Sequence, residues 1–138
     1  TTGWASSNAT SLMLAAVTNS NTNVIAYHPV LSGDGHYVAF KAMPRTSTPT
    51  QDLALVLRVN LHSGATDGIA ANADGNATDW DDQAGPVISA DGQIVAYGAV
   101  DRPRQGAGRR VYVWTAATRT ATVASVNRSG VAGNVRRS

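Results

Sequence analysis

Apolar and polar residues alternate in two similar stretches of the chain, HYVAFKA (residues 36–42) and QIVAYGA (residues 93–99). Alternation with a period of two is typical of a β-strand that turns one face toward a core. Each stretch follows an Asp-Gly pair, Asp34-Gly35 in one case and Asp91-Gly92 in the other. Because glycine accepts a positive φ and an aspartate side chain bonds nearby backbone, these pairs predict tight turns. The pattern therefore predicts two similar β-hairpins.

The two hairpins are parts of a longer repeat. HPVLSGDGHYVAFKA (residues 28–42) aligns with GPVISADGQIVAYGA (residues 85–99) at an offset of 57. Further along, VLRVNLHSGATDGIA (residues 56–70) aligns with VYVWTAATRTATVAS (residues 111–125) at an offset of 55, and WASSNATSLMLA (residues 4–15) aligns with the end of the second unit. Two independent offsets of similar length indicate one structural unit that recurs.

Each unit predicts four short strands. The first strand precedes the Asp-Gly turn and the second follows it, and a polar loop with Pro or Gly separates the second strand from the third. A further turn, at Ser63-Gly64 or at Thr118-Arg119, leads into the fourth strand. Alternate positions of a strand share a face. The residues expected to pack between adjacent sheets are Val38, Phe40, Val95 and Tyr97.

Four antiparallel strands that recur in this way are typical of a β-propeller blade. An immunoglobulin-like sandwich is the alternative, but a sandwich does not require its strands to recur as a four-strand block. We therefore expect an all-β chain of two four-stranded antiparallel blades plus one outer strand of a preceding blade, near Ser11–Val17. The expected divisions are residues 1–27 (outer strand and linker), 28–84 (blade 1) and 85–138 (blade 2 and basic tail). Two blades do not close a ring, so we expect a larger propeller or one completed by an oligomer.

The pattern Pro-x-hydrophobic-Ser-x-Asp-Gly-x-hydrophobic-Val-Ala-Phe/Tyr stands at residues 29–40 and 86–97. It resembles the TolB-like (WD-type) propeller repeat of exported bacterial proteins, and the resemblance extends over residues 4–134. The chain departs from that repeat at Asn60 and Thr115, where an aspartate is common, and at Thr118-Arg119, which replaces Thr-Gly. The resemblance implies a propeller fold and an exported protein (periplasmic, cell-surface or secreted). It implies no single activity, because propellers serve as enzymes, docking platforms and structural modules.

Composition and charge narrow the functional classes. Apolar residues make up 43% of the chain and charged residues 14%, which suffices for a core. There is no cysteine, which excludes disulfides and thiolate metal sites, and Lys41 is the only lysine. No apolar run is long enough to span a membrane. Residues 1–100 carry three basic side chains against eight aspartates, whereas residues 101–138 carry eight arginines against Asp101. Such a division is typical of solvated loops followed by a basic tail. The alternative is a surface for an acidic partner or for the acidic half of a neighbouring copy.

The sequence contains no catalytic signature. Ser32 and Ser89 lack the Gly-x-Ser-x-Gly pattern of an activated nucleophile. The three histidines, His28, His36 and His62, lack the spacing of a metal motif. We therefore expect no catalytic residue and no cofactor. The turn residues that we expect to have a structural role are Asp34, Gly35, Asp91 and Gly92.

Binding remains the more promising class. In NADGNATDWDD (residues 72–82), oxygen-bearing side chains at alternate positions and a turn at Gly75 resemble a calcium loop without its terminal glutamate, although a solvated loop has the same composition. The candidate calcium ligands are Asp74, Asp79, Asp81 and Asp82. Candidate interaction residues are Trp80 in the same loop and the arginines Arg102, Arg104, Arg109 and Arg110. Few aromatic residues lie between these arginines, which argues against nucleic acid. Three Asn-x-Ser/Thr sequons, at Asn8, Asn76 and Asn127, leave a glycan open.

Three functions are consistent with this pattern. The first is a non-enzymatic exported module whose blades contact other proteins or further copies of the chain. The second is the propeller domain of a larger enzyme, of the type that gates a peptidase. The third is a carbohydrate-binding or calcium-binding surface module. A downstream hydrolase segment in the gene would favour the second, and calcium calorimetry or a glycan screen would test the third.

Overall fold

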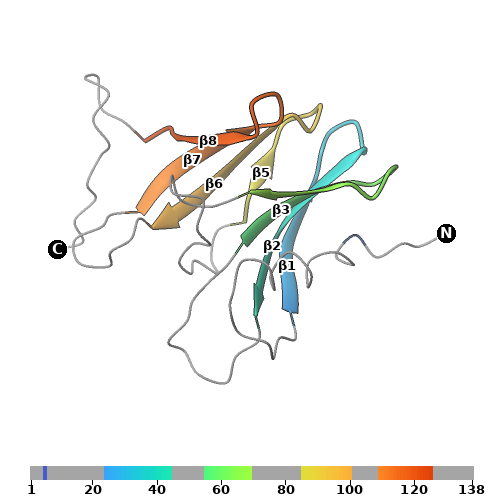
Figure 1. The fold of residues 1–138 in the computed structure, drawn as a ribbon, viewed down its shortest axis with the longest axis horizontal. Helices are drawn as coiled ribbons and strands as arrows, with labels where there is room; N and C mark the ends of the chain where they lie inside the picture. Colours follow the sequence, from blue (N-terminus) through green and yellow to red (C-terminus); the bar gives the residue numbers. More distant parts are fainter. Residues whose placement is uncertain (1–4, 6–23, 45–54, 70–84, 101–108, 126–138) are drawn as a thin grey trace.

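The computed structural model describes residues 5, 24–44, 55–69, 85–100 and 109–125. Within these ranges the chain is all-β, with eight strands in two four-stranded antiparallel sheets and no helix (Figure 1). The all-β, two-sheet part of the predicted fold class is thereby confirmed. In the same ranges there is no helix of the length and hydrophobicity needed to cross a bilayer. The outer strand expected near Ser11–Val17 lies outside the described residues.

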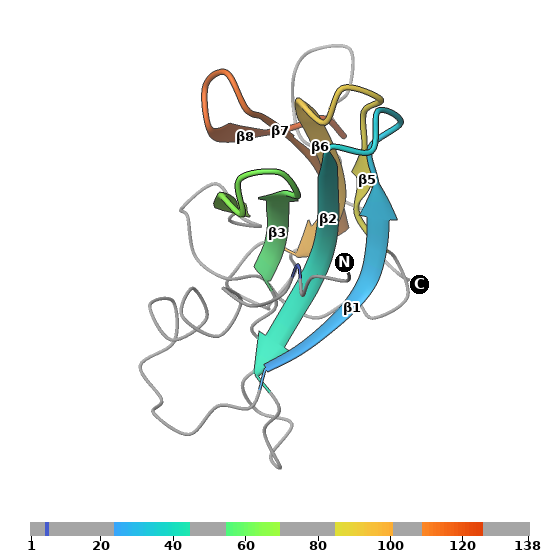
Figure 2. The same cartoon turned by 90° about the vertical axis from the view of Figure 1, so that its right-hand side faces the viewer.

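Each sheet follows the order of the chain. Sheet 1 consists of β1 (Val24–Leu31), β2 (Tyr37–Pro44), β3 (Leu55–Asn60) and β4 (Thr66–Ile69). Sheet 2 consists of β5 (Val87–Ile88), β6 (Ile94–Val100), β7 (Arg109–Thr115) and β8 (Thr120–Val123). Figure 2 shows the sheets stacked, with β5 beside β1 and the hairpin turns of both sheets at one end. We call this end the turn end; it comprises residues 32–37, 60–66, 89–94 and 115–120.

The pairing register of the two sheets repeats with the sequence. Val38 pairs with Val59 in sheet 1, and the equivalent Val95 pairs with Trp114 in sheet 2. Strand β1 differs from β5, because it begins at Val24, ahead of the expected first strand, and its register shifts between Tyr27 and Val30. His28 lies in this shift with a positive φ of 53°. Such a bulge adds a residue to one strand and bends it.

The sheets pack through unlike faces. In each sheet we call the side that bears Val38 or its equivalent Val95 the first face, and the opposite side the second face. The second face of sheet 1 contributes Ala39, Val56 and Ile69 to the core between the sheets. Sheet 2 contributes larger side chains to this core, namely Val95, Tyr97, Ala99, Tyr112 and Trp114. The rings of Tyr97 and Tyr112 stack here, with centroids 5.7 Å apart. Aromatic rings carry much of the energy of such a core because each buries a large apolar area.

Val38 and Phe40 correct one expectation. Val95 and Tyr97 pack between the two sheets as predicted, but Val38 and Phe40 lie on the first face of sheet 1, away from sheet 2. There they form a second core with Ala42, Leu55, Leu57 and Val59, contacted by Ala5 and Val24. The reason is the repeat itself, since equivalent residues of successive sheets point in the same direction. Sheet 1 is thus buried on both faces.

Two cations are buried on the second face of sheet 1. Lys41 is 3% exposed and Arg58 is 5% exposed. Lys41 pairs with Val56 across the β2–β3 ladder, so it shares the face that meets sheet 2. Its equivalent in sheet 2 is Gly98. Charged side chains are seldom buried unless polar groups lie beside them. Lys41 and Arg58 therefore require polar partners on this face.

Candidate functional site

The turn between β1 and β2 is held by one serine and one aspartate. The Ser32 hydroxyl donates to Asp34 Oδ1 (2.5 Å) and accepts the Tyr37 N–H (3.0 Å). Asp34 Oδ1 also accepts the His36 N–H (3.0 Å), and the Gly35 N–H donates to the Ser32 carbonyl (3.0 Å). Gly35 has a φ of 73°, which explains the glycine at this position. The turn therefore satisfies its backbone groups with its own side chains.

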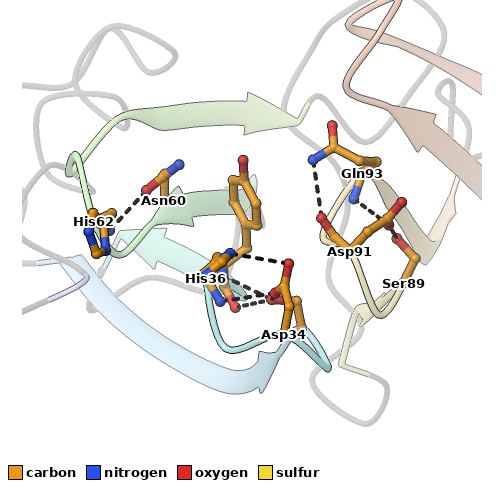
Figure 3. Close-up of polar contacts among 9 residues, drawn as sticks. Asp34, His36, Asn60, His62, Ser89, Asp91 and Gln93 are labelled. Carbon is orange, nitrogen blue, oxygen red and sulfur yellow. Dashed lines mark hydrogen bonds and ion pairs between the residues drawn. The ribbon is translucent and has the colours of Figure 1, made fainter.

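The turn between β5 and β6 has the same geometry (Figure 3). The Ser89 hydroxyl donates to Asp91 Oδ1 (2.6 Å) and accepts the Ile94 N–H (3.0 Å). Asp91 Oδ1 accepts the Gln93 N–H (3.0 Å), and Gly92 has a φ of 70°. The structure thus places both predicted Asp-Gly pairs in turns between the first and second strands of their sheets. The Ser-x-Asp-Gly motif is a self-contained turn that occurs twice.

The hydrogen bonds in these turns lower the pKa of both aspartates. The hydroxyls of Ser32 and Ser89 are the largest cause, and the backbone N–H groups of His36 and Gln93 add to it. Each carboxylate therefore stays ionised, and each hydroxyl proton is directed to a carboxylate that is a weak base. A serine nucleophile needs the opposite arrangement, in which a base removes the hydroxyl proton. The geometry supports a structural role for Ser32 and Ser89.

The two turns contact each other across the sheets. The Asp34 N–H donates to the Ala90 carbonyl at 2.9 Å. A Cβ placed on Gly33 would lie 3.1 Å from the Ala90 Cβ, so the two backbones approach closely. The Tyr37 ring lies over Gly92, where a Cβ would overlap it. A glycine is required at position 92 for two reasons: the backbone is left-handed there, and the aromatic ring of Tyr37 from the neighbouring sheet packs directly on it.

Beside this contact lies a network of cations, rings and one carboxylate. Arg58 stacks on Tyr37 (4.1 Å from Cζ to the ring centroid) and on Trp114 of sheet 2 (5.2 Å). Its Nη1 lies 3.4 Å from Asp67 Oδ2, across the β3–β4 ladder. Arg119 of sheet 2 reaches back to donate to Asp67 Oδ1 at 2.7 Å. Asp67 is therefore shared by two arginines from different sheets, and we call these five residues the inter-sheet latch.

The latch belongs to this junction only. By the repeat, Arg58 corresponds to Val113 and Asp67 corresponds to Thr122, so sheet 2 carries no equivalent ion pair between these positions. Arg119 corresponds to Gly64 and keeps its left-handed backbone, with a φ of 54° against 72°. The Arg58 Nε and Nη1 are buried and have no hydrogen-bond partner among the described residues. The aromatic rings and the single carboxylate compensate this charge in place of hydrogen bonds.

The histidines of the turn end lie near one another but form no metal site. His36 Nδ1 is 3.4 Å from Asp34 Oδ2, and the rings of His36 and His62 have centroids 6.3 Å apart. Asn60 Oδ1 accepts the N–H of His62 at 2.9 Å (Figure 3). In the described part of the chain, no three His or Asp side chains are arranged to hold a metal ion.

Most binding residues predicted from the sequence fall outside the described ranges. These are Asp74, Asp79, Trp80, Asp81, Asp82, Arg102 and Arg104. Arg109 begins β7, and Arg110, next in that strand, is partly buried. Sequence reasoning missed the inter-sheet latch. A signal was present at Arg58, which interrupts the apolar run of β3, but its partners lie far away in the sequence.

Exposed apolar side chains gather on two outward faces. Val87, Ile94 and Val111 are 62%, 45% and 46% exposed, and all three share the face of sheet 2 that points away from sheet 1. Leu31 and Leu61 are 60% and 45% exposed at the turn end of sheet 1. Clustered exposed apolar residues commonly mark contact surfaces. We call the sheet 2 face the open face.

Comparison of the chain with protein-family models, with curated proteins and with solved structures gave no match.

Proposed function

We propose that this chain is a β-propeller-type repeat module that works by contact between sheets and proteins, without catalysis. The observation that carries the proposal is the stacking through unlike faces. The second face of sheet 1 meets the first face of sheet 2. The stack therefore ends in the first face of sheet 1 on one side and in the open face of sheet 2 on the other. A stack of this kind continues in one direction, as blades do in a propeller.

The alternative sandwich fits this arrangement less well. In a two-sheet sandwich each sheet buries one face and turns the other to solvent. Here sheet 1 has apolar cores on both faces, and the open face of sheet 2 carries the exposed apolar residues Val87, Ile94 and Val111. The resemblance to the TolB-like repeat supports the same interpretation and adds an exported location to the proposal.

A contact function also agrees with the chemistry of the turns. Ser32 and Ser89 use their hydroxyls to hold Asp34 and Asp91. The opposite charges of the inter-sheet latch compensate one another within the junction. These polar groups hold the sheets in register and thereby keep the apolar open face in place.

Light scattering at several concentrations tests the proposal. We expect the wild-type chain to exceed its monomer mass of 14.3 kDa as concentration rises, at low and at high salt. Ile94→Asp places a charge on the open face and should return the chain to a monomer. Ile25→Asp is the matched control, because Ile25 is 43% exposed, comparable to Ile94 at 45%, but lies in β1. A folded wild-type chain that remains a monomer under all conditions would contradict the proposal.

A further inference from the structure

Both residues of the contact between Tyr37 and Gly92 have equivalents elsewhere in the repeat, and within the chain these two equivalents do not contact each other. In the repeat, Tyr37 corresponds to Ile94 and Gly92 corresponds to Gly35. Ile94 is 45% exposed, and it stands on the open face of sheet 2 as Tyr37 stands on the second face of sheet 1. A Cβ placed on Gly35 would meet none of the described residues within 4 Å. One end of the stack therefore offers a projecting side chain, and the other end offers an uncovered glycine turn.

The apolar residues around these two positions match in the same way. Within the chain, Val56 belongs to the core between the sheets, and Val30 and Ile88 pack against it. Their equivalents are Val111, Val87 and Leu31, and each of these is exposed at an end of the stack. Ala116 also packs against that core, and its equivalent is the exposed Leu61. The two ends thus carry both halves of the contact that the chain already forms internally.

Backbone groups of the turns extend the match. The Asp34 N–H donates to the Ala90 carbonyl within the chain. The equivalent pair would be the Asp91 N–H and a Gly33 carbonyl. Neither group has a backbone partner within the described residues. Exposed donors and acceptors at matching positions of two ends favour a specific contact over a merely apolar one.

We propose that a second copy of the chain docks head to tail at the turn end. Ile94 of one copy covers Gly35 of the next, Val87 meets Leu31 and Leu61, and the Asp91 N–H donates to the next Gly33 carbonyl. The middle of the first face of sheet 1 is already buried, so the contact is confined to the turn end. Because the surfaces differ, the assembly closes as a ring or continues as a filament. This inference rests on the proposed stack of repeats.

The junction between copies differs chemically from the junction within the chain. Val113 and Thr122 take the places of Arg58 and Asp67, so the contact lacks the ionic part of the inter-sheet latch. We therefore expect it to be weaker than the internal junction. It should also persist at high salt, since salt screens charge pairs and not apolar contacts.

Cysteine cross-linking in the cysteine-free chain tests the geometry. Within the chain, positions 33 and 90 lie side by side, with Cβ atoms 3.1 Å apart when one is placed on Gly33. Across copies, position 90 of one chain should meet position 33 of the next. We would mix the Gly33→Cys chain with the Ala90→Cys chain in oxidised glutathione. The expected product is a mixed dimer that clearly exceeds the half expected from random pairing of equal amounts.

Two controls separate this inference from the proposed function. The double variant G33C/A90C should form a disulfide within one chain, which tests the stack itself. Adding Ile94→Asp to the Ala90→Cys chain should abolish the mixed dimer, whereas adding Ile25→Asp should not. Statistical pairing, a dominant Ala90→Cys homodimer or no cross-link at all would overturn head-to-tail docking. If the disulfide within one chain also fails to form, the proposed stack is wrong as well.

Discussion

Gly35 and Gly92 share one backbone conformation but have different surroundings. Both have φ values near 70°, whereas only Gly92 lies under the Tyr37 ring. Within a single chain, Gly35→Ala should therefore cost only the left-handed backbone, about 1–2 kcal/mol. Gly92→Ala should add the overlap with Tyr37 and cost about 2–4 kcal/mol in total. Urea unfolding of both variants measures the difference, and equal losses would show that Tyr37 does not pack on this turn.

The serines of the turns control the acid behaviour of the neighbouring aspartates. Removing the hydroxyl in Ser89→Ala should raise the pKa of Asp91 toward its ordinary value and leave the pKa of Asp34 nearly unchanged. Because the folded-state pKa of each aspartate is lowered, the stability it contributes is present at neutral pH and is lost as pH falls through that pKa. NMR titration of the carboxyl carbons measures both values. Ser32→Ala is the matched variant, with the opposite result expected.

At this scale the sequence predicts the turns well and the latch poorly. Asp34-Gly35 and Asp91-Gly92 carry their own turn chemistry, and their partners lie within a few residues. The environment of Arg58 depends on Tyr37, Asp67 and Trp114, which come from three different strands. Local propensity carries no information on such partners. The sequence signal was only that Arg58 interrupts the apolar run of β3.

At the scale of elements, Asp67 in β4 joins the two sheets electrostatically. Asp67→Asn should destabilise the chain by about 3 kcal/mol, because it leaves the buried Arg58 without its countercharge. Arg119→Ala should cost less than about 1 kcal/mol, since that side chain is 71% exposed and its ion pair is screened by water. Urea unfolding compares the two variants. A similar loss for both would mean that the ion pair to Arg119, and not the burial of Arg58, gives Asp67 its importance.

Strand existence and order follow from the alternating pattern, but strand ends do not. The pattern predicts the eight strands that the described residues contain. It misses the early start of β1 at Val24, because the bulge at His28 breaks the alternation there. It also leaves open which face of a strand meets which neighbour. Val38 and Phe40 pack away from sheet 2 because the direction of stacking is a property of two sheets, and no single strand encodes it.

At the scale of the whole molecule, the burial of Lys41 has a practical consequence. The second face of sheet 1 is closed by sheet 2, and the only ε-amino group of the chain lies there, 3% exposed. Amine-reactive reagents should therefore modify Lys41 only when the sheets separate. Its labelling rate, followed by mass spectrometry, would report opening of the junction, and Asp67→Asn should accelerate it. Rapid labelling of the folded wild-type chain would contradict this. For immobilisation or dye attachment, the native fold offers its single lysine only at the cost of opening the molecule.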